Sequence, residues 1–268
     1  LIGRILAGVD PIWKDEPIWV GGALVGAITF LVGSGVLSDW FQWARGRSTA
    51  EHPHDQFESG WRRYLSISYD HKVIGIQYGF TSLVVFALAG LLALVFRTEL
   101  AEPEIQFLQP DTFNTVMSLH GIGMIYGILL GVAAMSNYLV PLLIGANDMV
   151  FPRLNAFAYW INVPAGVLLF SSIFFGGFDT GWTGYPPLSA RAPLGVMFFF
   201  MGVYLFGLSS ILGSLNIIAT IIRKRAPGMG YFRMPIFVWA ALATSLIGLT
   251  ATQLIGLSFQ MVMFERLF

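Results

Sequence analysis

The chain has 268 residues, of which 56% are hydrophobic, 15% aromatic and only 11% charged. Soluble domains carry roughly a quarter charged residues, so this composition is that of an integral membrane protein. Fifteen basic and fifteen acidic residues cancel, so the net charge does not indicate a nucleic acid or another polyanionic partner. There is no cysteine, which excludes thiolate metal sites, iron–sulfur clusters and disulfides.

Six apolar runs are long enough to cross a bilayer, which requires about 20 residues in helical form. They cover residues 18–37, 73–96, 114–144, 155–176, 195–222 and 235–264. All six are expected to be helices, because an open strand edge leaves backbone polar groups without partners in lipid. The sequence therefore predicts an all-α polytopic membrane protein with six transmembrane helices.

The basic residues indicate the orientation of these spans, since cytoplasmic loops are enriched in Lys and Arg. Ten of the fifteen basic residues fall on one side of the six-span alternation. They are Arg45, Arg47, Arg62, Arg63, Lys72, Arg153, Arg223, Lys224, Arg225 and Arg233. We therefore expect the loops that contain Lys72 and Arg225 to face the cytoplasm, and the loop from Glu99 to Asp111 to face outside.

His120 is the only histidine inside a membrane-length apolar run. An ionisable group in hydrocarbon costs several kcal/mol unless it has a partner. An imidazole in such a place is often a ligand of haem iron or of a metal ion. The alternative is a histidine hydrogen-bonded to a neighbouring helix, and the residue by itself leaves both interpretations open.

A polar face runs along the fifth span. Ser209, Asn216 and Thr220 are spaced seven and four residues apart, so they share one side of a helix, with Ser210 beside them. Asp148 follows His120 by 28 residues, about 42 Å along a helix, so it is expected to emerge at the cytoplasmic surface. Polar side chains in a span can join helices or hold a file of waters. An acid at the entrance favours proton conduction.

Several segments, in order and with matching spacing, resemble subunit I of the haem–copper oxygen reductases, the catalytic subunit of cytochrome c oxidase. They are residues 68–75, the segment around His120, and residues 137–155, 181–188 and 207–216. The resemblance covers about three quarters of the chain. It implies that residues 64–268 are the N-terminal part of that subunit, with its first five helices. Residues 1–63 would then be an N-terminal extension with one extra transmembrane helix and a cytoplasmic linker.

The resemblance implies that His120 is an axial ligand of a low-spin haem, expected to be haem A. Arg97 matches the arginine that hydrogen-bonds the haem formyl group, and its alternative role is interfacial snorkelling. Glu99 resembles a residue beside a weak cation site in some members, and a plain surface acid is the alternative.

The resemblance also assigns a proton channel of the D type. Asp148 matches its mouth, and Asn137 and Asn155 match the asparagines just inside it. Tyr78 matches a tyrosine along the channel. Its upper part corresponds to Ser209, Ser210 and Asn216. One departure is Ala158, where many members have a channel serine.

The function implied is that of a terminal respiratory oxidase, which passes electrons from cytochrome c through the low-spin haem to oxygen and takes up protons. The second haem and copper are expected from the remaining half of subunit I, because the family binds them on later helices. Other expected partners are oxidase subunits II and III, cytochrome c or another c-type donor, and the lipid of a bacterial inner membrane.

Three alternatives remain. The first is a relative similar to nitric oxide reductase, which the channel pattern led by Asp148 argues against. The second is a proton or ion transporter without a cofactor, although no internal repeat typical of such transporters is visible. The third is a purely structural membrane subunit.

Overall fold

The computed structural model describes residues 60–267 and a few positions between residues 25 and 47. All regular structure in this part of the chain is helical, and five helical segments are long and apolar enough to cross a membrane. These segments are α4 (His71–Glu99), α5 (Pro110–Ile144), α6 (Pro152–Trp160) continued by α7 (Asn162–Ser171) and η3 (Ser172–Phe175), α9 (Gly195–Arg223) and α10 (Ile236–Leu267). Short helices η2 (Trp61–Tyr64), α8 (Leu188–Arg191) and η4 (Tyr231–Arg233) lie outside the spans. The predicted all-α polytopic class is confirmed, while the expected span 18–37 lies largely outside the described residues.

Single residues at the ends of α4 and α5 define where these helices begin and end. At the start of α4, the Asp70 side chain accepts a hydrogen bond from the Lys72 backbone N–H at 2.7 Å. Helix α5 begins at Pro110, four residues before the expected start, since proline is well tolerated in the first turn. It ends at Gly145, whose φ of 73° is left-handed and costs glycine little.

The third described span is broken in its middle. Helix α6 ends at Trp160 and α7 begins at Asn162. Pro164 has no backbone N–H, so it cannot donate the helical hydrogen bond to the carbonyl of Trp160. The missing bond leaves a one-residue interruption, but Ile161 keeps right-handed helical dihedrals, so the helical direction continues from α6 into α7.

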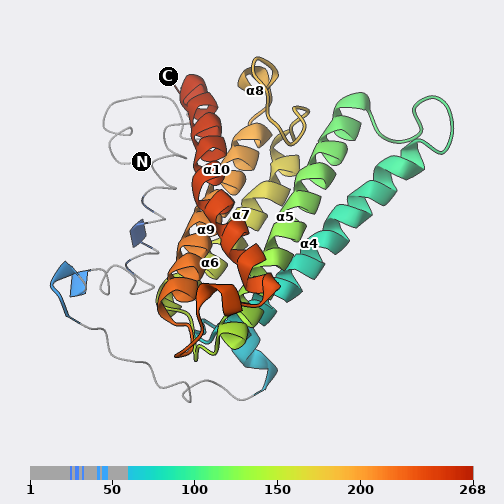
Figure 1. Ribbon diagram of the computed structural model, residues 1–268. Coiled ribbons are helices and arrows are strands. Elements are labelled where there is room, and N and C mark those ends of the chain that lie inside the picture. The colour runs from blue at the N-terminus through green and yellow to red at the C-terminus, as the bar shows by residue number, and fades with distance from the viewer. Residues whose placement is uncertain are drawn as a thin grey trace.

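Helices α4 and α5 form an antiparallel hairpin, and α9 lies among α5, α6, α7 and α10 (Figure 1). Glycines permit the close approach of α4 and α5. A Cβ added to Gly123 would lie 3.0 Å from the Cβ of Ala89, and one added to Gly127 would lie 3.1 Å from the ring of Phe86. Small residues at helix contacts are the usual means of close packing in lipid.

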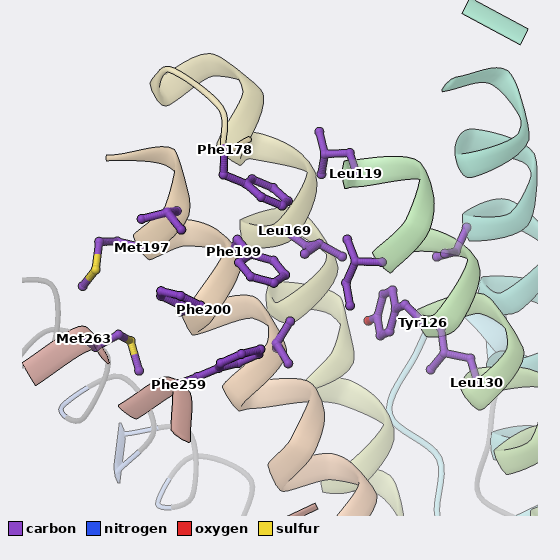
Figure 2. Close-up of a cluster of buried hydrophobic side chains, with 14 of the residues drawn as sticks. Leu119, Tyr126, Leu130, Leu169, Phe178, Met197, Phe199, Phe200, Phe259 and Met263 are labelled. Atoms are coloured by element: carbon purple, nitrogen blue, oxygen red, sulfur yellow. The ribbon is translucent and has the colours of Figure 1, made fainter. Parts of the chain in front are cut away.

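Aromatic side chains fill the space between α9 and its neighbours. Figure 2 shows Phe178, from the loop after η3, stacked on Phe199 of α9 with ring centroids 4.4 Å apart. Phe200 of α9 meets Phe259 of α10 at 4.8 Å. Such packing contributes much of the association of helices within lipid, where transfer from water contributes little.

Candidate functional site

His120 lies in α5 and faces the neighbouring helix of the hairpin. Its Nδ1 is 2.9 Å from the backbone carbonyl oxygen of Ala89 in α4. A carbonyl oxygen only accepts, so Nδ1 carries the proton and donates it, and the lone pair of the neutral ring is on Nε2. The ring of Phe96 packs edge-on against the imidazole, with centroids 5.4 Å apart. This arrangement fits an iron ligand, because metal-binding histidines are commonly oriented by a hydrogen bond from the other ring nitrogen.

Two charged residues lie in the last turn of α4, directly after Phe96, which packs against His120. Arg97 is exposed in the last turn, and it makes no hydrogen bond or ion pair with any residue that the structure describes. Glu99 is buried, and its carboxylate accepts backbone N–H groups from Gln106, Phe107 and Leu108 at 2.8 to 2.9 Å. Glu99 therefore organises the loop between α4 and α5, whereas the expected haem contact of Arg97 stays a prediction.

Asp148 lies in a short segment between α5 and α6, which we name the entrance loop (residues 148–151). The sequence places this residue at a surface, but its side chain is only 5% exposed. Its Oδ1 accepts the backbone N–H of Met149 at 2.6 Å. The loop is folded against α9, which is why an acid expected at the surface is buried.

Two side chains of α9 and that of Lys224, which directly follows α9, bond to the backbone of the entrance loop and are spaced four residues apart. Asn216 accepts the Phe151 N–H at 3.0 Å and donates to the Phe151 carbonyl at 3.1 Å. Thr220 accepts the Val150 N–H at 3.0 Å. Lys224 donates from Nζ to the Met149 carbonyl at 3.2 Å. The sequence indicated this face of α9 through Asn216 and Thr220, but it did not identify Lys224.

A second polar cluster lies deeper in the bundle. Ser209 donates to the carbonyl of Ala158 at 2.6 Å and accepts from Nδ2 of Asn162 at 2.7 Å. The Tyr78 hydroxyl is 3.5 Å from Ser209 Oγ, and Tyr126 donates to the Asn162 carbonyl at 2.7 Å. Asn162 was missed from the sequence, although it follows Asn155 by seven residues, a spacing that places both on one helical face.

Ser210 is separate from this cluster. A Cβ added to Gly248 of α10 would lie 3.7 Å from Ser210 Oγ and 2.7 Å from Ser214 Oγ. Ser210 therefore lies at the contact between α9 and α10, while Ser209 faces α6 and α7.

Several buried polar atoms have no hydrogen-bond partner among the described residues. Four of the eight such atoms belong to the histidine and asparagines near the proposed channel residues: His71 Nε2, Asn137 Oδ1, Asn155 Nδ2 and Asn162 Oδ1. His71 and Asn137 are adjacent, since His71 Nδ1 donates to the Asn137 backbone carbonyl at 2.9 Å. Buried polar atoms almost always have a partner, and ordered water is the usual one when protein groups are absent. These four atoms are therefore positions at which water could be bound.

Within the described residues, no group of three or more His, Asp or Glu side chains is placed to hold a metal ion. The fold and the site define a polytopic helical membrane protein with two histidines, His71 and His120, whose Nδ1 atoms donate to backbone carbonyls, and with buried polar side chains between α4, α6, α7 and α9. The chain belongs to the family of cytochrome c and quinol oxidase polypeptide I, whose family model matches residues 73–268.

Curated relatives agree with this family. The chain is 44% identical to cytochrome c oxidase subunit 1 of Thermostichus vulcanus over 76% of its length, and 44% identical to that of Synechocystis sp. over 81%. It is 42% identical over 68% of its length to a heme-copper oxidase subunit I+III of Aeropyrum pernix. The chain spans 38%, 39% and 23% of the lengths of these relatives, respectively.

Proposed function

We propose that residues 64–268 form the N-terminal part of the catalytic subunit of a terminal respiratory oxidase. The whole subunit would pass electrons from cytochrome c, or another c-type donor, to oxygen. The observation that carries the proposal is the hydrogen bond from His120 Nδ1 to the Ala89 carbonyl, which leaves Nε2 as the ligating atom. The membership in the oxidase family and the polar track that begins at Asp148 support it, and the track favours an oxidase over a relative similar to nitric oxide reductase.

In this proposal His120 holds the iron of a low-spin haem, expected to be haem A, through Nε2. A haem bound there would supply one-electron transfer. The bond to Ala89 fixes the direction of the ring and raises the basicity of the ligating nitrogen. Arg97, at the end of α4, would hydrogen-bond a polar substituent of the haem. The second haem and copper would be bound by the remaining half of subunit I.

The polar track is proposed to carry protons on bound water. Asp148 would collect protons, and Asn137 and Asn155 would bind the first waters through the amide atoms that lack protein partners. Farther along, Tyr78 and Ser209 would continue the path in the deeper cluster. Asn216, expected in the upper part of the channel, bonds to Phe151 and would act at its start, while Ser210 lies at the contact between α9 and α10. At Ala158 no hydroxyl is available, and its backbone carbonyl already accepts from both Ser209 and Asn162, so it fixes these two side chains in place.

The assembly would be integral to a bacterial inner membrane, with the Lys72 and Arg225 loops in the cytoplasm and the loop from Glu99 to Asp111 outside. Residues 1–63 would add one further transmembrane helix and a cytoplasmic linker. Subunits II and III are the proposed partners. One relative is named as a subunit I+III, which supports a third subunit or domain.

A reduced-minus-oxidised absorption spectrum of the assembled oxidase tests the ligand. His120→Ala should abolish the low-spin haem signal, because no other described histidine faces this position in the hairpin. Met117→Ala is a matched control, since Met117 is exposed one turn earlier on the same helix and should leave the signal intact. Retention of the signal in His120→Ala would overturn the proposed function.

A further inference from the structure

The backbone of the entrance loop is bonded to side chains at the end of α9. Its groups at residues 149, 150 and 151 bond to Lys224, the residue that follows α9, and to Thr220 and Asn216 of α9, in reverse order along the two segments. Thr220 also donates to the Asn216 carbonyl at 2.7 Å, which fixes the orientation of its hydroxyl. The three side chains therefore act as consecutive supports along one face of α9.

Lys224 bonds to Met149, the residue directly after Asp148. Its ammonium donates to the Met149 carbonyl, while the Met149 N–H donates to the Asp148 carboxylate. Both polar groups of the Met149 backbone are thus engaged, one by a cation and one by the acid. Bonds with a charged partner are stronger than neutral ones. Lys224 also caps the carboxyl end of α9, where a positive charge is favoured by the helix dipole.

We propose that Lys224 is a positioning residue for Asp148, which holds the entrance loop so that the carboxylate stays aligned with the buried track. This inference rests on the proposed function of Asp148. Lys224 does not touch the proposed path of the electron, so its loss should slow proton entry and leave the haem unaffected. If Lys224 served only to orient the protein in the membrane through its charge, the neighbouring Arg223 would supply the same charge. Removal of Lys224 would then leave proton uptake unchanged.

The neighbouring residue provides the matched control. Arg223 is also a cation at the end of α9 and is exposed, but it makes no bond to the entrance loop among the described residues. Lys224→Met and Arg223→Met remove the same charge one position apart. In the assembled oxidase in lipid vesicles, Lys224→Met should slow proton uptake by about three- to tenfold. Arg223→Met should take up protons at the wild-type rate. Lys224→Arg keeps a cation at this position and should also keep the wild-type rate. All three variants should keep the low-spin haem spectrum.

A second variant provides an independent measurement. Thr220→Val keeps the side-chain shape but removes the acceptor of the Val150 N–H. It should slow proton uptake in the same direction and should accelerate hydrogen exchange at the Val150 amide. If Lys224→Met does not assemble, Thr220→Val decides the question: fast exchange with normal uptake would mean that loop position does not matter.

The inference is overturned if Lys224→Met and Arg223→Met take up protons at the same rate, or if Lys224→Arg is as slow as Lys224→Met. Asp148→Asn separates this failure from that of the proposed function. If Asp148→Asn slows uptake and Lys224→Met does not, only the positioning role is lost. If Asp148→Asn has no effect, the proposed channel itself is wrong.

Discussion

Asp148 is a buried acid, although the sequence places it at a surface. Its carboxylate bonds to Met149, and the loop around it is bonded to α9. A buried acid that is held this firmly suits a group that must accept and release protons at one defined position. The sequence indicated Asp148 through its spacing from His120, but spacing along one helix cannot show how the following loop folds.

At the residue scale, we expect Asp148→Asn to lower proton uptake by an order of magnitude or more, since the amide cannot take up a proton near neutral pH. Uptake would be followed with a pH-sensitive dye outside vesicles that contain the assembled oxidase. Asp111→Asn is the control, because Asp111 is exposed at the opposite end of α5. Equal uptake in the two variants would contradict the channel.

Other residues show where sequence reasoning ends. The spacing of Ser209, Asn216 and Thr220 predicted a common buried face, and all three are buried on α9. The pattern could not reveal that both amide atoms of Asn216 are bonded to Phe151, because that contact joins segments 65 residues apart. Whether Asn216 also contacts the proposed file of water stays a prediction.

At the scale of elements, the hairpin of α4 and α5 depends on how closely the helices approach. We expect Gly123→Leu to separate them, because even a Cβ at this position would lie 3.0 Å from the Cβ of Ala89. Overpacking of this kind typically costs about 1–3 kcal/mol. The Ala89 carbonyl would move away from His120, and the low-spin haem signal should shift or weaken.

The control for this variant is the residue next to Ala89. A Cβ at Gly90 would have no neighbour within 4 Å, so Gly90→Leu should leave the haem spectrum unchanged. A normal spectrum in Gly123→Leu would show that the position of the Ala89 carbonyl does not control the ligand.

The junction before α9 is a second constraint at this scale. A Cβ on Gly195 would collide with backbone atoms of Gly177 and with the Ser172 carbonyl, which cannot rotate away. We therefore expect Gly195→Ala to reduce the yield and thermal stability of the assembled protein, measured by the temperature at which it loses its haem. Gly213→Ala, on the same helix with nothing within 4 Å, should be neutral, and a neutral Gly195→Ala would contradict the close backbone contact at this junction.

Hydropathy predicted the five described spans well, because each is a long apolar run. It could not predict their ends, which depend on single capping residues such as Asp70 and Gly145. Nor did it predict the break in the third of these spans, although Pro164 was visible in the sequence. A short interruption hardly changes the mean hydropathy of a span.

At the scale of the whole molecule, the outer faces of α4 and α10 carry exposed apolar side chains. Examples are Phe80, Leu83 and Leu94 on α4 and Ile247 and Leu254 on α10, each more than 60% exposed. Patches of this size are normally covered by lipid or by other helices. The relatives are more than twice as long as this chain, so further helices of a complete subunit are the expected cover for part of these faces.

Orientation can be tested because this chain contains no cysteine. Arg62→Cys and Glu102→Cys would each place one exposed thiol in a loop at opposite ends of the bundle. In a background without other reactive cysteines, a membrane-impermeant maleimide added to spheroplasts should label Glu102→Cys at once. Arg62→Cys should be labelled only after permeabilisation, and the reverse pattern would invert the proposed topology.

The hairpin of α4 and α5 also determines how the His120 ring is directed. The contacts that aim the His120 ring come from Ala89 and Phe96, and the glycine contacts that set their position lie within the same two helices. One end of the hairpin is closed by Glu99 and the other by the bond between His71 and Asn137. The direction of the imidazole is therefore set within the first two described spans, and neither of these contacts comes from α9 or α10.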